Sequence, residues 1–250
     1  MKKYELTDIS SNYDGVYFSV VYRIRALRDI PRHGVKAGDL GGWIEHEYNL
    51  PQDGDAWVGD GAIVRGNALV IENAFVYGEN TIVCGNAIIS GNATVKYGAS
   101  VYDDAHVFGK ATISSRATIG DYAQVYGNAT IDGYVVVYSH AHVYGRAIIS
   151  QPDKKCQKCK IHGHAKVYGY AKIYGPVWIS GHAEVYGNAT IALNGWYAEL
   201  YGEVKVYENA FIGGRISLHG KTHIHGRALF QKDSWADVPE GDYAETRIYA

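Results

Sequence analysis

The sequence is poor in several residue types, and each shortage narrows the choice of structure and function. Of the 250 residues, 3 are cysteine, 5 are proline and 1 is methionine. Three cysteines do not make a disulfide framework for a chain of this length, so we expect reduced thiols. No stretch approaches the roughly 18 apolar residues of a membrane-spanning helix, and the first residues lack the apolar run of a signal peptide. We therefore expect a cytoplasmic protein with no membrane partner.

An excess of charge of one sign is also missing. The chain has 24 Lys and Arg residues against 26 Asp and Glu residues, which gives a formal net charge of -2. No run of basic residues is long enough to follow a phosphate backbone. We therefore expect no duplex nucleic acid among the partners.

What the chain has in abundance is one short repeat. Through residues 56–230 a six-residue unit recurs: a small residue, a variable one, an aliphatic one, another variable one and two turn residues, as in 123–128. This alternation predicts strands that turn their small and aliphatic side chains inward. Pairs such as Gly127-Asn128 tolerate the positive φ of a corner. Short strands joined by corners must wind into a coil, and we expect three hexads, eighteen residues, to close each turn.

The two ends of the chain depart from the repeat. Residues 16–27 are rich in β-branched and aromatic side chains and predict a β-hairpin over the first coil. A solenoid exposes an unpaired strand edge at each end, and atypical segments usually cover it. We therefore expect an N-terminal β cap over 1–50, a solenoid over 51–230 and a C-terminal cap or tail over 231–250.

The repeat is interrupted in three places. One residue is added at Asn80 and three are added within 194–197. The third interruption keeps the six-residue count but puts Asp153 and Lys155 where small and aliphatic residues belong. Burying two unpaired charges in a narrow core is costly. We therefore expect a loop outside the coil at 152–158.

The hexads resemble those of the hexapeptide-repeat proteins that fold as a single-stranded, left-handed parallel β-helix. Residues 35–44 and 54–58 are similar to the entry segment of the YdcK-like members, which occur in bacteria and in phages or prophages. The resemblance implies an all-β fold with three hexads per coil, and it favours a homotrimer. Members are often labelled acyltransferases, and in acyltransferases of this shape extrusions from the coil help to form the active site. The resemblance thus directs attention to the loop at 152–158.

The histidines inside the repeat take outward positions. Three of them are candidate catalytic bases: His142, His162 and His164. Further residues are assigned to a ligand-binding face: His106, Tyr126, Tyr144, Arg146 and His182. Counting in steps of eighteen makes Tyr144 a neighbour of His162, and puts Arg146 in one column with His164. A neutral imidazole accepts a proton from a hydroxyl or amine, as acyl transfer from acetyl-CoA requires. The alternative is a solvated ladder of polar side chains.

A possible metal site follows the polar interruption. Cys156, Cys159, His162 and His164 are four potential ligands within nine residues, and zinc favours thiolate and imidazole. The same eighteen-residue count places Cys159 on the face of His142 and His162. The alternative is that Cys159, at an inward small position, is an inert thiol that replaces alanine.

Two functions remain open on the sequence. One is a rigid binding or scaffold protein of phage or prophage type, whose outward columns, aromatic rows included, contact a protein or a small molecule. The other is an acyl-CoA-dependent acyltransferase acting on a hydroxyl or amine near the loop at 152–158. Fold alone does not decide between them.

Overall fold

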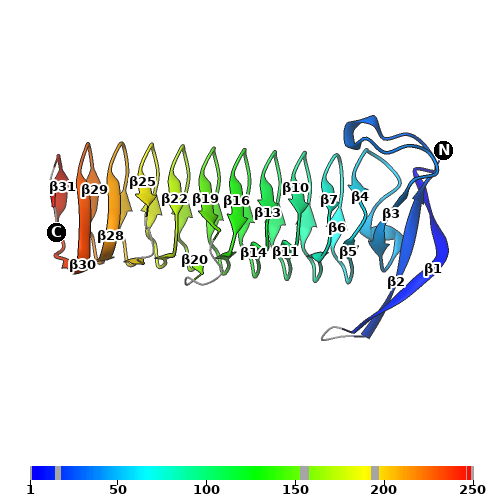
Figure 1. Cartoon of the computed structure of the whole chain (residues 1–250), viewed down its shortest axis with the longest axis horizontal. Coiled ribbons are helices and arrows are strands. Elements are labelled where there is room, and N and C mark those ends of the chain that lie inside the picture. The colour runs from blue at the N-terminus through cyan, green and yellow to red at the C-terminus, as the bar shows by residue number, and fades with distance from the viewer. Residues whose placement is uncertain (1, 15–17, 153–157, 193–196, 246, 249–250) are drawn as a thin grey trace. The chain divides into compact units, whose positions relative to one another are not determined.

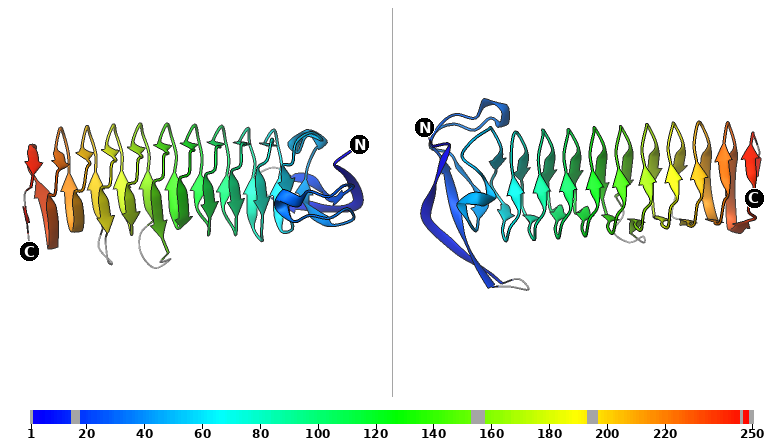
Figure 2. Two further views of the ribbon diagram at one scale, coloured as in Figure 1. Left: turned by 90° about the horizontal axis from the view of Figure 1, so that it is seen from above. Right: turned by 180° about the vertical axis from the view of Figure 1, so that it is seen from behind.

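A computed structural model describes residues 2–14, 18–152, 158–192, 197–245 and 247–248. The chain forms two compact units, Met1–Arg116 and Ala117–Ala250. Within each unit, short parallel strands stack into successive coils (Figures 1 and 2). The predicted all-β solenoid is therefore confirmed. In the described part of the chain, no helix has the length and apolar character needed to cross a bilayer.

The first unit begins with an antiparallel hairpin. β1 (Tyr4–Asp14) pairs with β2 (Phe18–Ala26), which also pairs antiparallel with β3 (Leu40–Ile44). β3 then pairs in parallel with β5 (Ala62–Val64). The predicted N-terminal hairpin is thus confirmed. β3 connects the hairpin to the solenoid, because it pairs with β2 on one side and with β5 on the other. Two 3-10 turns flank β3: η1 (Pro31–His33) and η2 (Glu47–Asn49).

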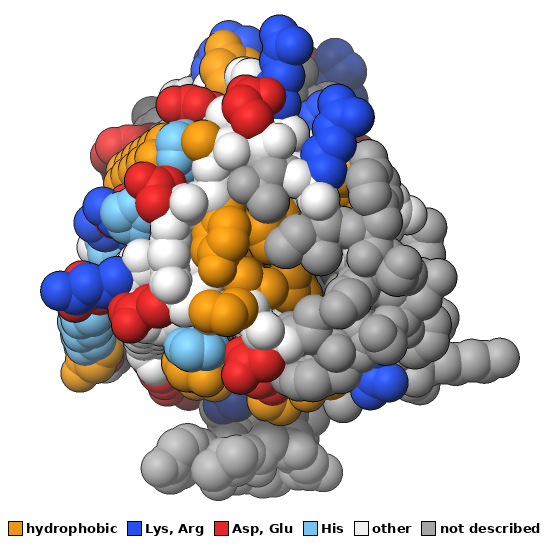
Figure 3. All heavy atoms as spheres, turned by 90° about the vertical axis from the view of Figure 1, so that its left-hand side faces the viewer, with side chains coloured by type: hydrophobic (Ala, Val, Ile, Leu, Met, Phe, Trp, Pro, Cys, Tyr) orange, Lys and Arg blue, Asp and Glu red, His pale blue; other side chains and the backbone are white. Residues whose placement is uncertain are grey.

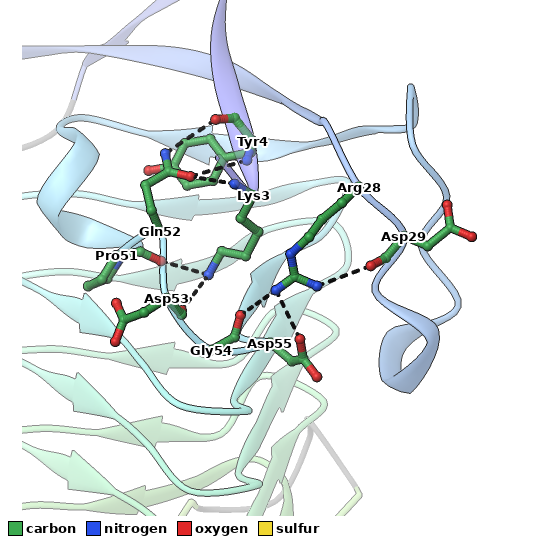
Figure 4. Close-up of polar contacts among 9 residues, drawn as sticks. All are labelled: Lys3, Tyr4, Arg28, Asp29, Pro51, Gln52, Asp53, Gly54 and Asp55. Atoms are coloured by element: carbon green, nitrogen blue, oxygen red, sulfur yellow. Dashed lines mark hydrogen bonds and ion pairs between the residues drawn. The ribbon is translucent and has the colours of Figure 1, made fainter. Parts of the chain in front are cut away.

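Buried polar contacts fasten the start of the chain to the first coil (Figure 4). The Lys3 side chain is fully buried, and its Nζ donates hydrogen bonds to the carbonyl oxygens of Pro51 and Asp53 at 2.7 and 3.2 Å. Arg28 forms an ion pair with Asp55 at 3.0 Å. Burial, followed by the charge of Arg28, lowers the pKa of Lys3 to about 8. The hairpin is therefore anchored by an amine that is costly to keep charged.

The coils of the first unit form three parallel rows. The first row contains β4 (Trp57–Val58), β7 (Phe75–Tyr77), β10 (Thr94–Lys96) and β13 (Thr112–Ser114). The second contains β5, β8 (Thr81–Val83) and β11 (Ser100–Val101). The third contains β6 (Leu69–Val70), β9 (Ile88–Ile89) and β12 (His106–Val107). Paired residues are eighteen apart, as in Thr94 with Thr112, or nineteen where the pair spans Asn80, as in Phe75 with Thr94.

The second unit repeats the three rows. The first contains β16 (Thr130–Gly133), β19 (Ile148–Gln151), β22 (Lys172–Tyr174), β25 (Thr190–Ala192), the first parts of β28 (Phe211–Leu218) and β30 (Leu229–Val238), and β32 (Arg247–Ile248). The second contains β14 (Thr118–Ile119), β17 (Val135–Val137), β20 (Cys159–Ile161), β23 (Val177–Ile179), β26 (Ala198–Leu200) and the later parts of β28 and β30. The third contains β15 (Gln124–Val125), β18 (His142–Val143), β21 (Lys166–Val167), β24 (Glu184–Val185), β27 (Lys205–Val206), β29 (His223–His225) and β31 (Asp242–Ala244).

The register of these strands shows how the second unit handles its interruptions. Val135 pairs with Cys159, twenty-four residues later, and Val177 pairs with Ala198, twenty-one residues later. The coil therefore skips one whole hexad and then three residues, both times at the corner between the first and second rows. Residues 153–157, most of the predicted loop, lie outside the described part of the chain. Parallel pairing continues through β31 and β32, so the last segment adds strands beyond residue 230.

The core of each coil is a thin layer of alanine and aliphatic side chains. Ala123 and Val125, for example, are both fully buried. The corners stack just as closely, because Gly127 has a φ of 75° and a Cβ added there would lie 2.9 Å from the carbonyl oxygen of Gly145. Function in the coils therefore depends on side chains that face outward.

Candidate functional site

Most of the candidate residues lie on one surface of the second unit. This surface consists of β15, β18, β21, β24 and β27 with the corners on both sides of that row, and we call it the tyrosine–histidine face. Figure 3 shows histidine and hydrophobic side chains lying in layers along one side of the molecule. The layers arise because each outward position recurs at the strand spacing of about 4.8 Å.

A column of aromatic rings runs along one edge of this face. Its members are Tyr126, Tyr144, Tyr168, Tyr186, Tyr207 and His225. Successive ring centroids lie 4.8 to 4.9 Å apart, and the ring planes are parallel to within 5°. The rings are half-buried, and burial is the largest cause that raises the pKa of each of the five phenols. We call this column the tyrosine ladder.

A second column, the histidine ladder, runs along the opposite edge. It consists of Tyr122, His140, His164 and His182, with centroids 5.0 to 5.1 Å apart and planes within 6° of parallel. His140 was not among the residues predicted from the sequence. A sequence count that skips the polar hexad, and so advances twenty-four residues there, would have placed His140 beside His164.

The strand between the ladders carries His142 and charged residues. His142 pairs with Lys166 on the next strand, and Lys166 forms an ion pair with Glu184 at 3.5 Å. Burial is the main cause that lowers the pKa of His142, followed by the charges of Lys166, His140 and His164. The imidazole of His142 is therefore neutral at neutral pH.

One coil of the second unit matches a known repeat family. A family model described as the YdcK beta solenoid repeat matches residues 123–139, which run from the start of β15 to just beyond β17. The chain therefore contains a β-solenoid repeat of the YdcK type at these residues. A search of the curated proteins finds no match. The resemblance of the hexads to YdcK-like repeats is thereby confirmed, and the resemblance of the entry segment stays a prediction.

The strand register differs from the one predicted across the polar hexad, so two predicted columns were wrong. Tyr144 stacks on Tyr168, not on His162. His162 instead stacks on Tyr138 at 4.8 Å. The Arg146 guanidinium lies 5.4 Å from the ring of Tyr170 and is not in one column with His164. Both errors have the same cause, because the predicted count did not skip the hexad.

The remaining predicted residues are dispersed. Cys159 is on β20 and fully buried, not on the face of His142, and burial raises the pKa of its thiol to about 12. Cys156 lies outside the described residues. His106 belongs to the first unit, where its Nε2 lies 3.0 Å from the Ser90 Oγ. Among the described residues, no group of three or more His, Cys, Asp and Glu side chains is arranged to hold a metal ion.

The candidate catalytic bases lie in separate columns of the coil. A general base is normally oriented by a third group and faces a position for the reacting atom. His142 forms no hydrogen bond or ion pair with a carboxylate in the described part of the chain, and the imidazoles of His164 and His182 stack on each other. These side chains run in parallel columns and do not converge on one point.

Proposed function

We propose that the chain is a rigid, non-catalytic binding protein of the cytoplasm, and that its tyrosine–histidine face contacts a protein partner. The observation that carries this proposal is the tyrosine ladder. Its stacked rings are already held in place before a partner arrives, so contact costs little side-chain entropy. Aromatic residues also supply much of the binding energy in protein interfaces.

The occupant that we assign to this face is a further copy of the same chain. Tyr122 and Tyr170, at its two edges, are 57% and 54% exposed, and Arg146 lies over the second of them. Charges of both signs alternate along the row between the ladders, with Glu184 paired in register to Lys166 and Lys205. A surface with alternating charge is complementary to a shifted copy of itself. The family resemblance favours a trimer of such copies.

The test is the mass of the purified chain by light scattering after size-exclusion chromatography. We expect the wild type to elute as an oligomer and the Tyr122→Ala/Tyr170→Ala variant as a monomer. Tyr174→Ala is the matched control, since Tyr174 is 40% exposed on β22, in another row. The control is expected to stay oligomeric. A monomeric wild type at micromolar concentration would contradict the assignment.

An acyl-CoA-dependent acyltransferase is the second candidate. It is favoured by the lowered pKa of His142 and His162, in both cases mainly through burial, which leaves a neutral imidazole available as a base. Under the binding-protein proposal, millimolar acetyl-CoA should not raise the melting temperature, and no acyl transfer should be detected. Stabilisation by acetyl-CoA, with turnover lost in His142→Ala, His162→Ala or His164→Ala, would favour the enzyme.

Zinc is the other cofactor hypothesis from the sequence. A cysteine binds zinc as its thiolate, whereas the Cys159 thiol is buried in the core with a raised pKa. We therefore expect elemental analysis of the purified chain to find less than one zinc per chain. Stoichiometric zinc that is lost in Cys159→Ala would revive the hypothesis.

A further inference from the structure

The first unit contains a hollow that the sequence did not predict. It has a volume of about 770 Å³, within the range of small-molecule sites. Its walls include Asp60, Gly78, Glu79, Asn80, Tyr97 and Arg116. We call it the corner pocket, because it lies where the first row of the unit turns into the second. This is the corner at which Asn80 adds one residue to the coil.

The aromatic wall of the pocket is a tyrosine at a corner position with a positive φ. Tyr97 has a φ of 54°, in the left-handed region that favours glycine, yet its side chain is 55% exposed. Its ring packs over Gly78, where an added Cβ would lie 2.9 Å from the Tyr97 Cδ1. Asn80, beside it in the pocket, also has a positive φ of 60°. Such a conformation costs a non-glycine residue about 1 kcal/mol or more, and other corner residues of the chain also adopt it, Glu72, Asp103 and Ser139 among them.

The polar groups of the pocket include two that are unpartnered. Glu79 and Asn80 are exposed, and neither side chain forms a hydrogen bond or ion pair with another described residue. Asp60, in contrast, is held by Arg23 in an ion pair of 2.6 Å. Beside the Tyr97 ring, a ligand can therefore donate hydrogen bonds to the Glu79 carboxylate. It can also exchange hydrogen bonds in both directions with the Asn80 amide.

The charges around the pocket indicate which ligand fits. Carboxylates are present at Asp60 and Glu79, and Arg116 brings positive charge to the same walls. Two further cations lie nearby: Arg23 is paired with Asp60, and the Lys96 ammonium lies 5.2 Å from the Tyr97 ring centroid. A strongly charged ligand of either sign would therefore meet like charge. A neutral polyhydroxyl ligand would not, and its hydroxyls match both donors and acceptors.

We propose that the corner pocket binds a neutral oligosaccharide. One sugar ring lies with its apolar face on Tyr97, and its hydroxyls form hydrogen bonds with Glu79 and Asn80. Sugar binding at this pocket does not depend on self-association of the second unit. It would give the solenoid a glycan-recognition site in addition to its interaction face.

The test uses the full chain and three neutral trisaccharides: cellotriose, maltotriose and triacetylchitotriose. Binding is measured by isothermal titration calorimetry and by saturation-transfer NMR. We expect at least one trisaccharide to bind with a millimolar or tighter Kd. Tyr97→Gly should weaken binding at least tenfold and still fold, because glycine accepts the φ at this position. Tyr97→Phe should keep most of the affinity, and Glu79→Gln should reduce it severalfold.

The control for this experiment is Tyr201→Ala, which removes a 44% exposed ring from the second unit and should leave sugar binding unchanged. Three results would overturn the proposal. They are no binding of any of the three sugars at millimolar concentration, unaltered affinity in both Tyr97→Gly and Glu79→Gln, or tighter binding of trilysine than of every sugar.

Discussion

The tyrosine–histidine face of the second unit and the corner pocket of the first use outward positions in opposite ways. On the face, each ring stacks on the ring of the next coil, as Tyr144 does on Tyr168, and Lys166 pairs with Glu184. In the pocket, one added residue disturbs the column, and Glu79 and Asn80 form no side-chain contact of this kind with any described residue. Where the repeat is regular, outward side chains stack or pair with those of the next coil. Where it is interrupted, polar side chains are left without such a neighbour and can bind a ligand.

The largest expected effect comes from breaking the close stacking of the corners. Gly145→Ala puts a Cβ 2.8 Å from the backbone nitrogen of Gly169 and forces alanine to a φ of 75°. Gly34→Ala imposes a similar φ of 71° with nothing within 4 Å. We expect a loss of about 2–4 kcal/mol for Gly145→Ala and about 1 kcal/mol for Gly34→Ala, by urea unfolding. Equal losses would show that stacking across coils adds nothing.

Removing one aromatic ring should cost stability on the face but not in the pocket. Tyr168 stacks on Tyr144 and Tyr186, so Tyr168→Ala should destabilise the chain by about 2–3 kcal/mol. Tyr168→Phe loses only the hydrogen bond that the hydroxyl donates to Glu184 at 3.2 Å, worth about 1 kcal/mol. Tyr97→Gly should change stability by less than about 1 kcal/mol, since strain relief offsets lost packing. A larger loss at Tyr97 than at Tyr168 would reverse the comparison.

Alkaline pH should change the stability contributions of Lys3 and of the tyrosine ladder in opposite directions. Lys3 has its pKa lowered to about 8, so between about pH 8 and 10 the unfolded chain binds more protons at this residue, and stability rises with pH. The ladder phenols have raised pKa values, so above about pH 10 the unfolded chain releases their protons first and stability falls. We expect a maximum in the urea midpoint near pH 10, and Lys3→Met should remove the rising limb. A midpoint that falls steadily from pH 8 would contradict the role of Lys3.

The smallest expected effect is at acid pH. Burial lowers the pKa of His142 and His162, so below about pH 6.5 the unfolded chain binds more protons and stability falls as the pH decreases. His142→Gln should make the urea midpoint less dependent on pH between 7 and 5. An unchanged slope in this variant would mean that His142 is as accessible to protons as a free imidazole.

The hexads predicted the solenoid because a small residue and an aliphatic one recur at the inward positions of nearly every unit, and short strands of this kind bury them by winding into a coil. Columns that do not cross the polar hexad, such as Tyr126 with Tyr144, followed from the same count. The prediction was wrong for columns that cross the polar hexad. There the register is set by strand pairing, as between Val135 and Cys159, and not by a fixed sequence spacing. The left-handed coil expected from the resemblance stays a prediction.

The corner pocket was missed for a different reason. The added residue at Asn80 was visible in the sequence, but its consequence depends on how neighbouring coils stack at that corner. Tyr97 stands in place of a turn residue, and the hexad count assigns it no role. Only the backbone shows that it has a positive φ and packs over Gly78.

The most direct test of the columns is a pair of double-mutant cycles measured by urea unfolding. In the structure Tyr144 contacts Tyr168 and lies apart from His162, whereas a simple eighteen-residue count would make His162 its neighbour. We predict a coupling energy of about 0.5–1.5 kcal/mol between Tyr144→Ala and Tyr168→Ala, and a coupling near zero between Tyr144→Ala and His162→Ala. Coupling to His162 without coupling to Tyr168 would contradict the skipped hexad and the ladders built on it.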